Sequence, residues 1–276
     1  DWVPGSLEVS LNVFPSILAD LQQGLQSILD QPHASFEQAL AANCPNVLTL
    51  EYVRDNGVAA PAITGRAKGL LAAGRAAMIG FESSTGGYES FGGNPGCETL
   101  TALGLVGFAH ERGVGDVDRE MIERTTEWLL GRRDGRGGFQ RNPKALDAFG
   151  SAGAEINDAY ITWALSELGQ TDIKSQTDNE NQTDIEAQVR HLVKTAGQSN
   201  DPYLLALAGA AAVNAGRRGD GNELLARLTA AQTKDGSLTG SAGSITRSRG
   251  RSLQIEATAL AALAWMKLPE YADQAD

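Results

Sequence analysis

The chain reads Gln31-Pro-His-Ala-Ser-Phe-Glu-Gln38 where a short loop runs into an apolar helix. Ser35 and Gln38 stand three residues apart at the expected start of that helix, so one side chain can reach the other across the first turn. Serine is also a favoured N-cap, and Glu37 in the first turn suits the positive end of the helix dipole. Taken alone, the segment favours the plain reading of a capped helix.

Three later stretches share one form: a Gly-rich turn, a polar loop and then a helix rich in small residues. In chain order they cover 86–108, 134–165 and 234–265. Their anchor residues Tyr88, Phe139 and Ser237 lie 51 and then 98 residues apart. The longer distance is about two of the shorter ones, and the apolar segment 202–212 lies where the intervening repeat is expected, without a Gly-Gly turn of its own. A period near 50 residues indicates a repeat architecture.

Helices of a second kind lie between these, at 121–132, 185–194 and 223–232. They are apolar on one face only, whereas the small-residue helices are apolar nearly all round. An amphipathic helix needs one wet face, and an apolar helix needs none. The alternation therefore predicts an all-α fold, an (α/α) toroid of about five to six helix pairs, with the Ala- and Gly-rich helices in the inner ring.

The residues before the repeats predict four further elements. Alternation from 7 to 13 indicates a short strand, and we expect 1–15 to be a strand or linker from a neighbouring domain. A one-faced helix follows up to Pro32, and 16–276 are expected to form the toroid. The next helix begins near Phe36, with a kink or short break at Pro45. Another helix covers about 62–80.

Composition excludes several classes of protein. The net charge is −11 and the chain has no basic stripe, which argues against nucleic acid and anionic membranes as partners. No run of 18 apolar residues is present, so direct membrane insertion is not expected. Two cysteines, Cys44 and Cys97, make neither a disulfide framework nor a zinc site, and we favour free thiols over a pair. Asp1 in first place suggests a mature or excised fragment of a longer protein.

The loop from Pro32 to Gln38 resembles the thioester loop of the α2-macroglobulin and complement family, which reads Pro-x-x-Cys-x-Glu-Gln. The Gly87–Gly96 loop with the Leu-Thr-Ala helix after it, and Trp128-Leu-Leu followed by Gly138-Phe139, resemble further landmarks of that family's thioester domain. The resemblance runs from about residue 3 to the end and implies the toroid fold. That toroid usually closes with about six helix pairs, whereas we count about ten helices here. We therefore expect a missing C-terminal pair and an apolar gap between the first and last helices.

In the family, the cysteine sulfur is bonded to the side-chain carbonyl of the glutamine three residues on. Here Glu37 and Gln38 match, but Ser35 stands in the place of the cysteine. A serine hydroxyl ionises far too weakly to act as a good leaving group, so we predict no thioester. Ser35 is either a cysteine replaced by design or a natural loss. The resemblance also puts Asp147 at the place of the complement histidine that attacks the thioester, although a helix-capping or solvated carboxylate is an equal reading of that residue.

The resemblance implies a covalent trap used once rather than an enzyme with turnover, and it implies no cofactor or metal. The expected partners are target proteases and adjoining macroglobulin-type domains. The expected location is extracellular or periplasmic, and Ala/Gly richness with Phe36 favours a bacterial member. In this form the domain is expected to be unreactive. A non-covalent interaction module on the same fold is the alternative.

An enzyme on the same toroid is the other rival. Terpene cyclases and prenyltransferases need an Asp-rich or zinc cluster, and the sequence contains no Asp-Asp-x-x-Asp. Toroid glycosidases need two opposed carboxylates, for which Glu98, Asp134, Asp158 and Glu256 are candidates among 34 acids. The tryptophans that stack on sugars in such sites number only four in this chain.

Overall fold

The computed structural model describes residues 35–115, 117, 119–144, 152–168, 185–240 and 243–275. Within these ranges the regular structure is helical, and the β-type pairings are two isolated bridges, Glu82–Tyr88 and Arg133–Phe139. The helices are α2 (Phe36–Asp55), α3 (Pro61–Ile79), α4 (Glu98–Arg112), α5 (Arg119–Gly131), α6 (Ala154–Leu168), α7 (Glu186–Ala196), α8 (Pro202–Asn214), α9 (Arg218–Ala230), α10 (Gly250–Trp265), the 3-10 turn Pro269–Tyr271 and α11 (Ala272–Ala275). The strand and helix predicted before residue 32 lie outside the described residues.

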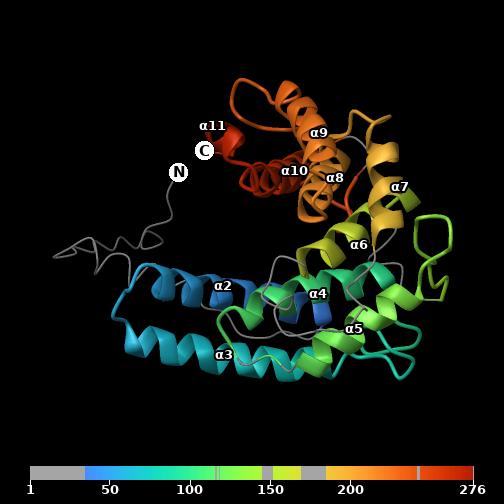
Figure 1. The fold of residues 1–276 in the computed structure, drawn as a ribbon. Coiled ribbons are helices and arrows are strands. Elements are labelled where there is room, and N and C mark those ends of the chain that lie inside the picture. Colours follow the sequence, from blue (N-terminus) through green and yellow to red (C-terminus); the bar gives the residue numbers. More distant parts are fainter. Residues whose placement is uncertain are drawn as a thin grey trace, which may run out of the picture.

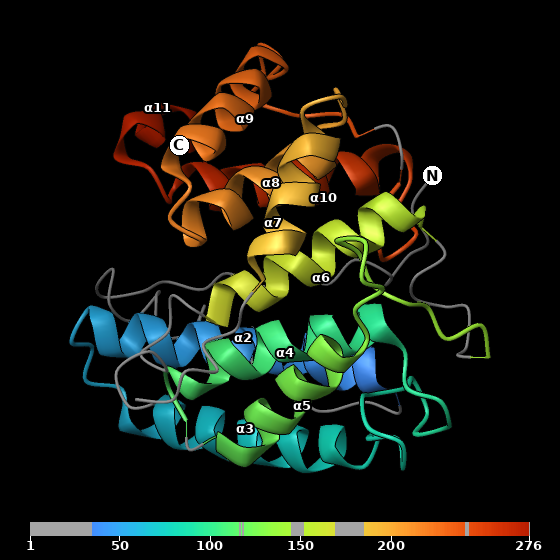
Figure 2. The same cartoon turned by 45° about the vertical axis from the view of Figure 1, so that its right-hand side comes forward.

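The helices curve round in chain order (Figures 1 and 2). An inner row is formed by α2, α4, α6, α8 and α10, each of which packs against the next. The outer helices cover this row: α3 packs on α2, α5 on α4, α7 on α6 and α8, and α9 on α8. This pairing confirms the predicted all-helical toroid.

Burial differs between the two rows as the sequence patterns predict. In α8 every residue from Pro202 to Ala212 is buried, and so is Asn214. In the outer helix α7 burial is confined to one face, which carries Gln188, Val189, Leu192 and Ala196. Small residues let the inner backbones approach closely. A Cβ on Gly221 of α9 would come within 3.2 Å of the Gly209 carbonyl oxygen of α8.

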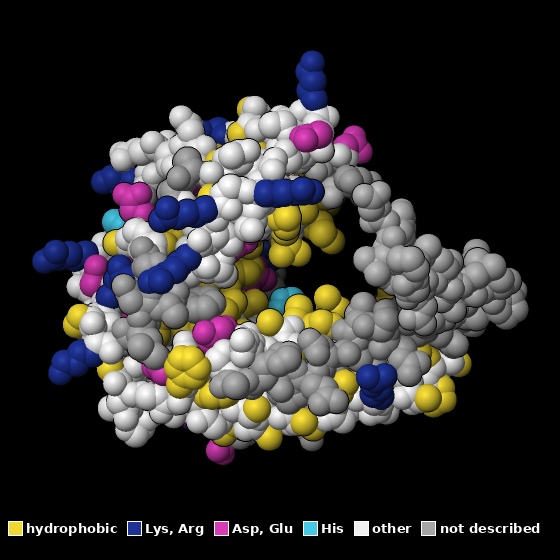
Figure 3. All heavy atoms as spheres, turned by 180° about the vertical axis from the view of Figure 1, so that it is seen from behind, with side chains coloured by type: hydrophobic (Ala, Val, Ile, Leu, Met, Phe, Trp, Pro, Cys, Tyr) yellow, Lys and Arg dark blue, Asp and Glu magenta, His cyan; other side chains and the backbone are white. Residues whose placement is uncertain are grey.

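Among the described residues, the inner row runs from α2 on one side to α10 on the other. Both of these helices carry exposed apolar side chains. Leu48 of α2 is 54% exposed, Ile255 and Leu263 of α10 are 62% and 53% exposed, and Met266 directly after α10 is 72% exposed. In the view from behind, hydrophobic side chains border an opening in the middle of the molecule (Figure 3). Apolar surface at both ends is what an open ring would show. The missing helix pair itself stays a prediction.

The short break considered at Pro45 does not occur, because α2 runs without interruption from Phe36 to Asp55. Proline lacks the N–H that would bond to the carbonyl four residues earlier. That carbonyl belongs to Ala41, which lies on the exposed face of the helix. Water can satisfy it there, so the helix continues.

The Gly-rich turns share one hydrogen-bond pattern. The N–H of Tyr88 donates to Thr101 Oγ1 at 2.8 Å, that of Phe139 to Asp158 Oδ1 at 3.0 Å, and that of Leu238 to Thr258 Oγ1 at 3.0 Å. Each acceptor belongs to the inner helix that follows its turn, α4, α6 or α10. These bonds tie every turn to the next helix of the inner row.

The third anchor is therefore Leu238 and not Ser237, a correction of one residue to the predicted register. The Ser237 carbonyl oxygen accepts from Thr233 N, just as the Gly138 carbonyl oxygen accepts from Asp134 N. Leu238 follows it and is fully buried. The sequence comparison misplaced the anchor because the third turn has Ser in place of the second glycine.

Candidate functional site

The candidate site lies at the N-terminus of α2, where Ser35 is the N-cap. Its backbone is extended, with φ −127° and ψ 161°, and its Oγ accepts a hydrogen bond from Gln38 N at 3.4 Å. Ser35 is 5% exposed, whereas the Gln38 side chain is exposed. The capping reading of Ser35 is thus confirmed. The bond also brings the Ser35 hydroxyl against the backbone of Gln38.

Glu37 lies in the first turn of α2, as predicted. Its Oε2 is buried, and no hydrogen-bond partner for it is present in the part of the chain that the structure describes. A carboxylate near the first free N–H groups of a helix is favoured by the helix dipole. The three described residues of the predicted site therefore share one helix turn. Asp147, the fourth, lies outside the described residues, as does Pro32.

Phe36 fixes this turn in the core. Its side chain is fully buried and stacks on the Tyr88 ring with centroids 4.8 Å apart. Phe108 of α4 meets it edge-on at 6.4 Å. Gly104 of α4 makes room, because a Cβ there would come within 2.5 Å of Phe36 Cζ. The position of Ser35 is thus set by an aromatic cluster and not by the loop alone.

The Gly-Gly-Tyr loop also holds the backbone of the site. The N–H of Phe36 donates to the Ser90 carbonyl oxygen at 3.0 Å. The next loop residues are ordered by Glu89, which is 4% exposed and whose Oε2 accepts from Phe91 N at 2.9 Å and Gly93 N at 3.2 Å. Phe91 itself is 68% exposed. The sequence predicted this loop as a landmark but not its bond to the start of α2.

Asp134 and Asp158, considered as enzyme carboxylates, both serve the second Gly-rich turn. Asp134 Oδ1 accepts from Arg136 N at 2.7 Å and Gly138 N at 3.0 Å. Asp158 Oδ1 accepts from Phe139 N at 3.0 Å. Burial raises the pKa of Asp158, and the Phe139 N–H offsets part of that rise. These contacts give both acids a structural role.

Glu98 and Glu256 also form contacts within the fold. Glu98 forms an ion pair with Arg132 at 2.7 Å and accepts from Asn142 N at 3.0 Å. Glu256 accepts from Tyr203 Oη at 3.2 Å. The four candidate acids thus connect loops and helices of the fold. Among the described residues no group of three or more potential metal-ligating His, Cys, Asp or Glu side chains is found.

Both cysteines are free thiols, which confirms the reading favoured from the sequence. Cys44 is exposed on α2, and Cys97 is buried directly before α4. Burial raises the pKa of the Cys97 thiol. As to membranes, no helix in the described ranges combines the length and apolar content needed to cross a bilayer.

The two rows of paired helices place the chain in the class of α/α-toroid domains. The family model described as the A-macroglobulin TED domain matches residues 7–275. The chain therefore belongs to the family of thioester domains of α2-macroglobulin-type proteins.

Curated relatives agree with this assignment. The chain is 23% identical over 270 residues to thioester-containing protein 1 allele S1 of Anopheles gambiae, covering 98% of this chain and 19% of that protein. It is 24% identical over 207 residues to allele R1 of the same protein, covering 74% and 15%. It is 24% identical over 174 residues to alpha-2-macroglobulin-like protein 1 of Mus musculus, covering 60% and 12%. The chain thus spans about a fifth or less of these relatives' length.

Proposed function

We propose that this chain is the thioester-type domain of a macroglobulin-like defence protein, in a form that cannot build the thioester. The observation that carries the proposal is the place of Ser35. Its hydroxyl caps α2 against Gln38 N at 3.4 Å, at the position that the family loop gives to the reactive cysteine. The fold around that turn is the family's, and the residue that would supply sulfur is replaced by one that supplies a helix cap.

The missing chemistry is a single acyl transfer. In a reactive domain, a thiol at position 35 would attack the carboxamide carbon of Gln38, a carbon–sulfur bond would form and ammonia would leave. An incoming amine would then attack the same carbon and expel the thiolate. Serine could form only an ordinary ester, whose alkoxide is a far poorer leaving group. The exposed Gln38 side chain would be open to an incoming amine.

The proposal extends to partners and location. By family resemblance, the complete protein would trap proteases or mark surfaces outside the cell or in a periplasm, next to macroglobulin-type domains. Asp147 is proposed at the place of the complement histidine, so that a reactive relative would transfer directly to amines. The bacterial origin stays a prediction. The family match does not favour the non-covalent interaction module considered from the sequence.

The experiment restores the sulfur. The Ser35→Cys substitution is made in a Cys44→Ser background, because Cys44 is an exposed free thiol that would react in a thiol assay. We expect the intact mass to fall by one ammonia and methylamine then to add to the protein and release one thiol. The matched control carries Gln38→Ala as well and should neither lose ammonia nor add methylamine.

Two outcomes contradict the proposal. A Ser35→Cys protein with native helicity that keeps its full mass would argue against a latent thioester site. Addition of methylamine to the unmodified chain would overturn the statement that this form is unreactive.

A further inference from the structure

A pocket far from Ser35 lies between α2, α3 and the turn after α4. It has a volume of about 660 Å³, within the range of roughly 300–1,000 Å³ typical of small-molecule sites. Leu50 on its wall is 15 residues after Ser35 along α2, or about 22 Å at the helical rise. The pocket is therefore separate from the candidate thioester turn.

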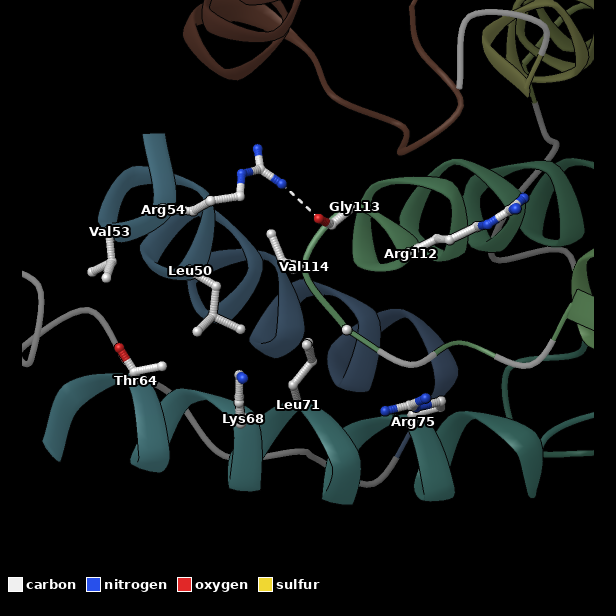
Figure 4. A pocket seen from close by; sticks show the side chains of 11 residues that line it. Leu50, Val53, Arg54, Thr64, Lys68, Leu71, Arg75, Arg112, Gly113 and Val114 are labelled. Atoms are coloured by element: carbon white, nitrogen blue, oxygen red, sulfur yellow. Dashed lines mark hydrogen bonds between the residues drawn. The ribbon is translucent and has the colours of Figure 1, made fainter. Parts of the chain in front are cut away.

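The pocket has an apolar floor. Leu50 of α2 and Leu71 of α3 are 5% and 1% exposed, and both belong to the smaller of the two hydrophobic clusters. Val53 and Val114 pack against that cluster and are only partly buried. Figure 4 shows Leu50 and Leu71 extending from the two helices toward the space between them. An apolar group placed there would cover surface that the fold leaves partly open.

The charged lining residues are all cationic, although the chain as a whole carries a net charge of −11. The residues that line the pocket are Leu50, Val53, Arg54, Thr64, Lys68, Leu71, Arg75, Arg112, Gly113, Val114 and Gly115, with no acid among them. A concave site lined by one sign of charge concentrates ligands of the opposite sign.

Some of these cations already form ion pairs or hydrogen bonds within the protein, and others do not. Arg54 donates to Asp55 Oδ1, and Arg75 is paired with Glu111 at 3.0 Å. Lys68 is exposed on α3, and within the described residues it forms no hydrogen bond or ion pair. Arg112 Nη1 is buried and has no hydrogen-bond partner among the described residues, so Lys68 is the exposed cation of the lining that is available to an anionic ligand.

We propose that this pocket binds a small organic anion, with its carboxylate or sulfate head against Lys68 and an apolar body over Leu50, Leu71 and Val114. Arg54 donates to the Gly113 carbonyl oxygen, as Figure 4 shows, and so links α2 to the turn after α4 at the rim of the pocket. In Figure 4 the Arg112 side chain extends along α4, away from Lys68, and we give it no role in binding.

The test uses decanoate as the probe, below its micelle concentration, with the full chain and isothermal titration calorimetry. Decanol supplies the same tail without charge, and acetate supplies the head alone. We expect decanoate to bind at one site and each of the other two to bind at least tenfold more weakly. Lys68→Gln should weaken decanoate about tenfold, the effect of losing a hydrogen bond to a charged group.

The matched control is Lys234→Gln, which removes the same charge from an exposed lysine after α9, on the other part of the ring. It should leave decanoate binding unchanged. Lys68 is exposed, so its replacement is not expected to disturb the fold, and circular dichroism checks this. Equal binding of decanol, equal losses in both lysine variants, or no decanoate binding would each overturn the proposal. None of these outcomes bears on the Ser35→Cys experiment.

Discussion

The ring of Phe36 lies on the ring of Tyr88 with their centroids 4.8 Å apart and their planes inclined by 27°. Phe36 is the residue after the Ser35 cap, and Tyr88 is the anchor of the first Gly-rich turn. Both side chains are fully buried. This contact joins two segments far apart in the sequence and makes the geometry of the candidate site depend on the repeat architecture.

Removing the Phe36 ring should therefore strongly destabilise the folded protein. We expect Phe36→Ala to lower the free energy of unfolding by about 3–5 kcal/mol, the usual cost of removing a buried aromatic ring. Urea unfolding followed by circular dichroism measures it. Phe91→Ala is the matched control, because this ring is 68% exposed and its loss should change stability by less than about 0.5 kcal/mol. Equal effects of the two substitutions would mean that Phe36 does not anchor the turn.

The hydrogen bond that ties the first Gly-rich turn to α4 should make a measurable contribution to stability, which can be tested at Thr101. Its Oγ1 accepts from Tyr88 N at 2.8 Å, so Thr101→Val leaves a buried N–H without an acceptor. We expect a loss of about 1–3 kcal/mol in unfolding free energy. Thr126→Val is the control, since Thr126 bonds only back to the Ile122 carbonyl oxygen among the described contacts. A Thr101 variant as stable as the Thr126 variant would contradict the proposed tie.

How much of this was predictable varies with the kind of contact. The alternation of one-faced and all-round apolar helices predicted the two rows correctly, because a helix with one apolar face lies at the surface and a helix that is apolar all round is buried. The third anchor was predicted one residue too early, because it is defined by the hydrogen bond that Leu238 N donates to Thr258 Oγ1 and not by a glycine. The pocket around Lys68 could not be predicted at all. It depends on where α2, α3 and the turn after α4 meet, and no local pattern encodes that.

At the candidate site, only the capping alternative for Ser35 could be checked. It is confirmed, since a small polar residue before an apolar helix has that role by itself, whereas the assignment of Ser35 to the cysteine position stays a prediction. The Ser90 carbonyl that receives Phe36 N was not foreseen, because it comes from the neighbouring turn. Pro45 was wrongly given a possible break, because the exposure of Ala41 on that helix face was unknown.

Replacing Ser35 should test the cap without any thioester chemistry. Ser35→Ala removes the oxygen that accepts from Gln38 N, and we expect a loss of about 1 kcal/mol in unfolding free energy. Ser35→Asp should keep most of the stability, because aspartate is an equally good N-cap. Thermal unfolding of the three proteins side by side gives the comparison. An alanine variant that unfolds at the same temperature as the parent would show that the cap contributes nothing.

Glu111 gives the chain a pH dependence whose sign can be stated. It is 1% exposed at the end of α4, and burial raises its pKa from 4.5 to about 7, while Arg75 acts in the opposite direction. The folded protein therefore holds this proton more tightly than the unfolded chain does. The contribution of Glu111 to stability is complete below about pH 4.5 and is lost as the pH rises through about 7.

Glutamine stays neutral over this range, so Glu111→Gln should become more stable relative to the parent as the pH rises from 5 to 8. The relative gain should approach about 3 kcal/mol, at about 1.4 kcal/mol for each pKa unit. Urea unfolding at several pH values measures it. Glu223→Gln, which changes an exposed glutamate of α9, should keep the parent's pH profile. If the Glu111 variant also follows the parent's profile, the carboxylate is ionised in the folded protein throughout this range, and its pair with Arg75 outweighs burial.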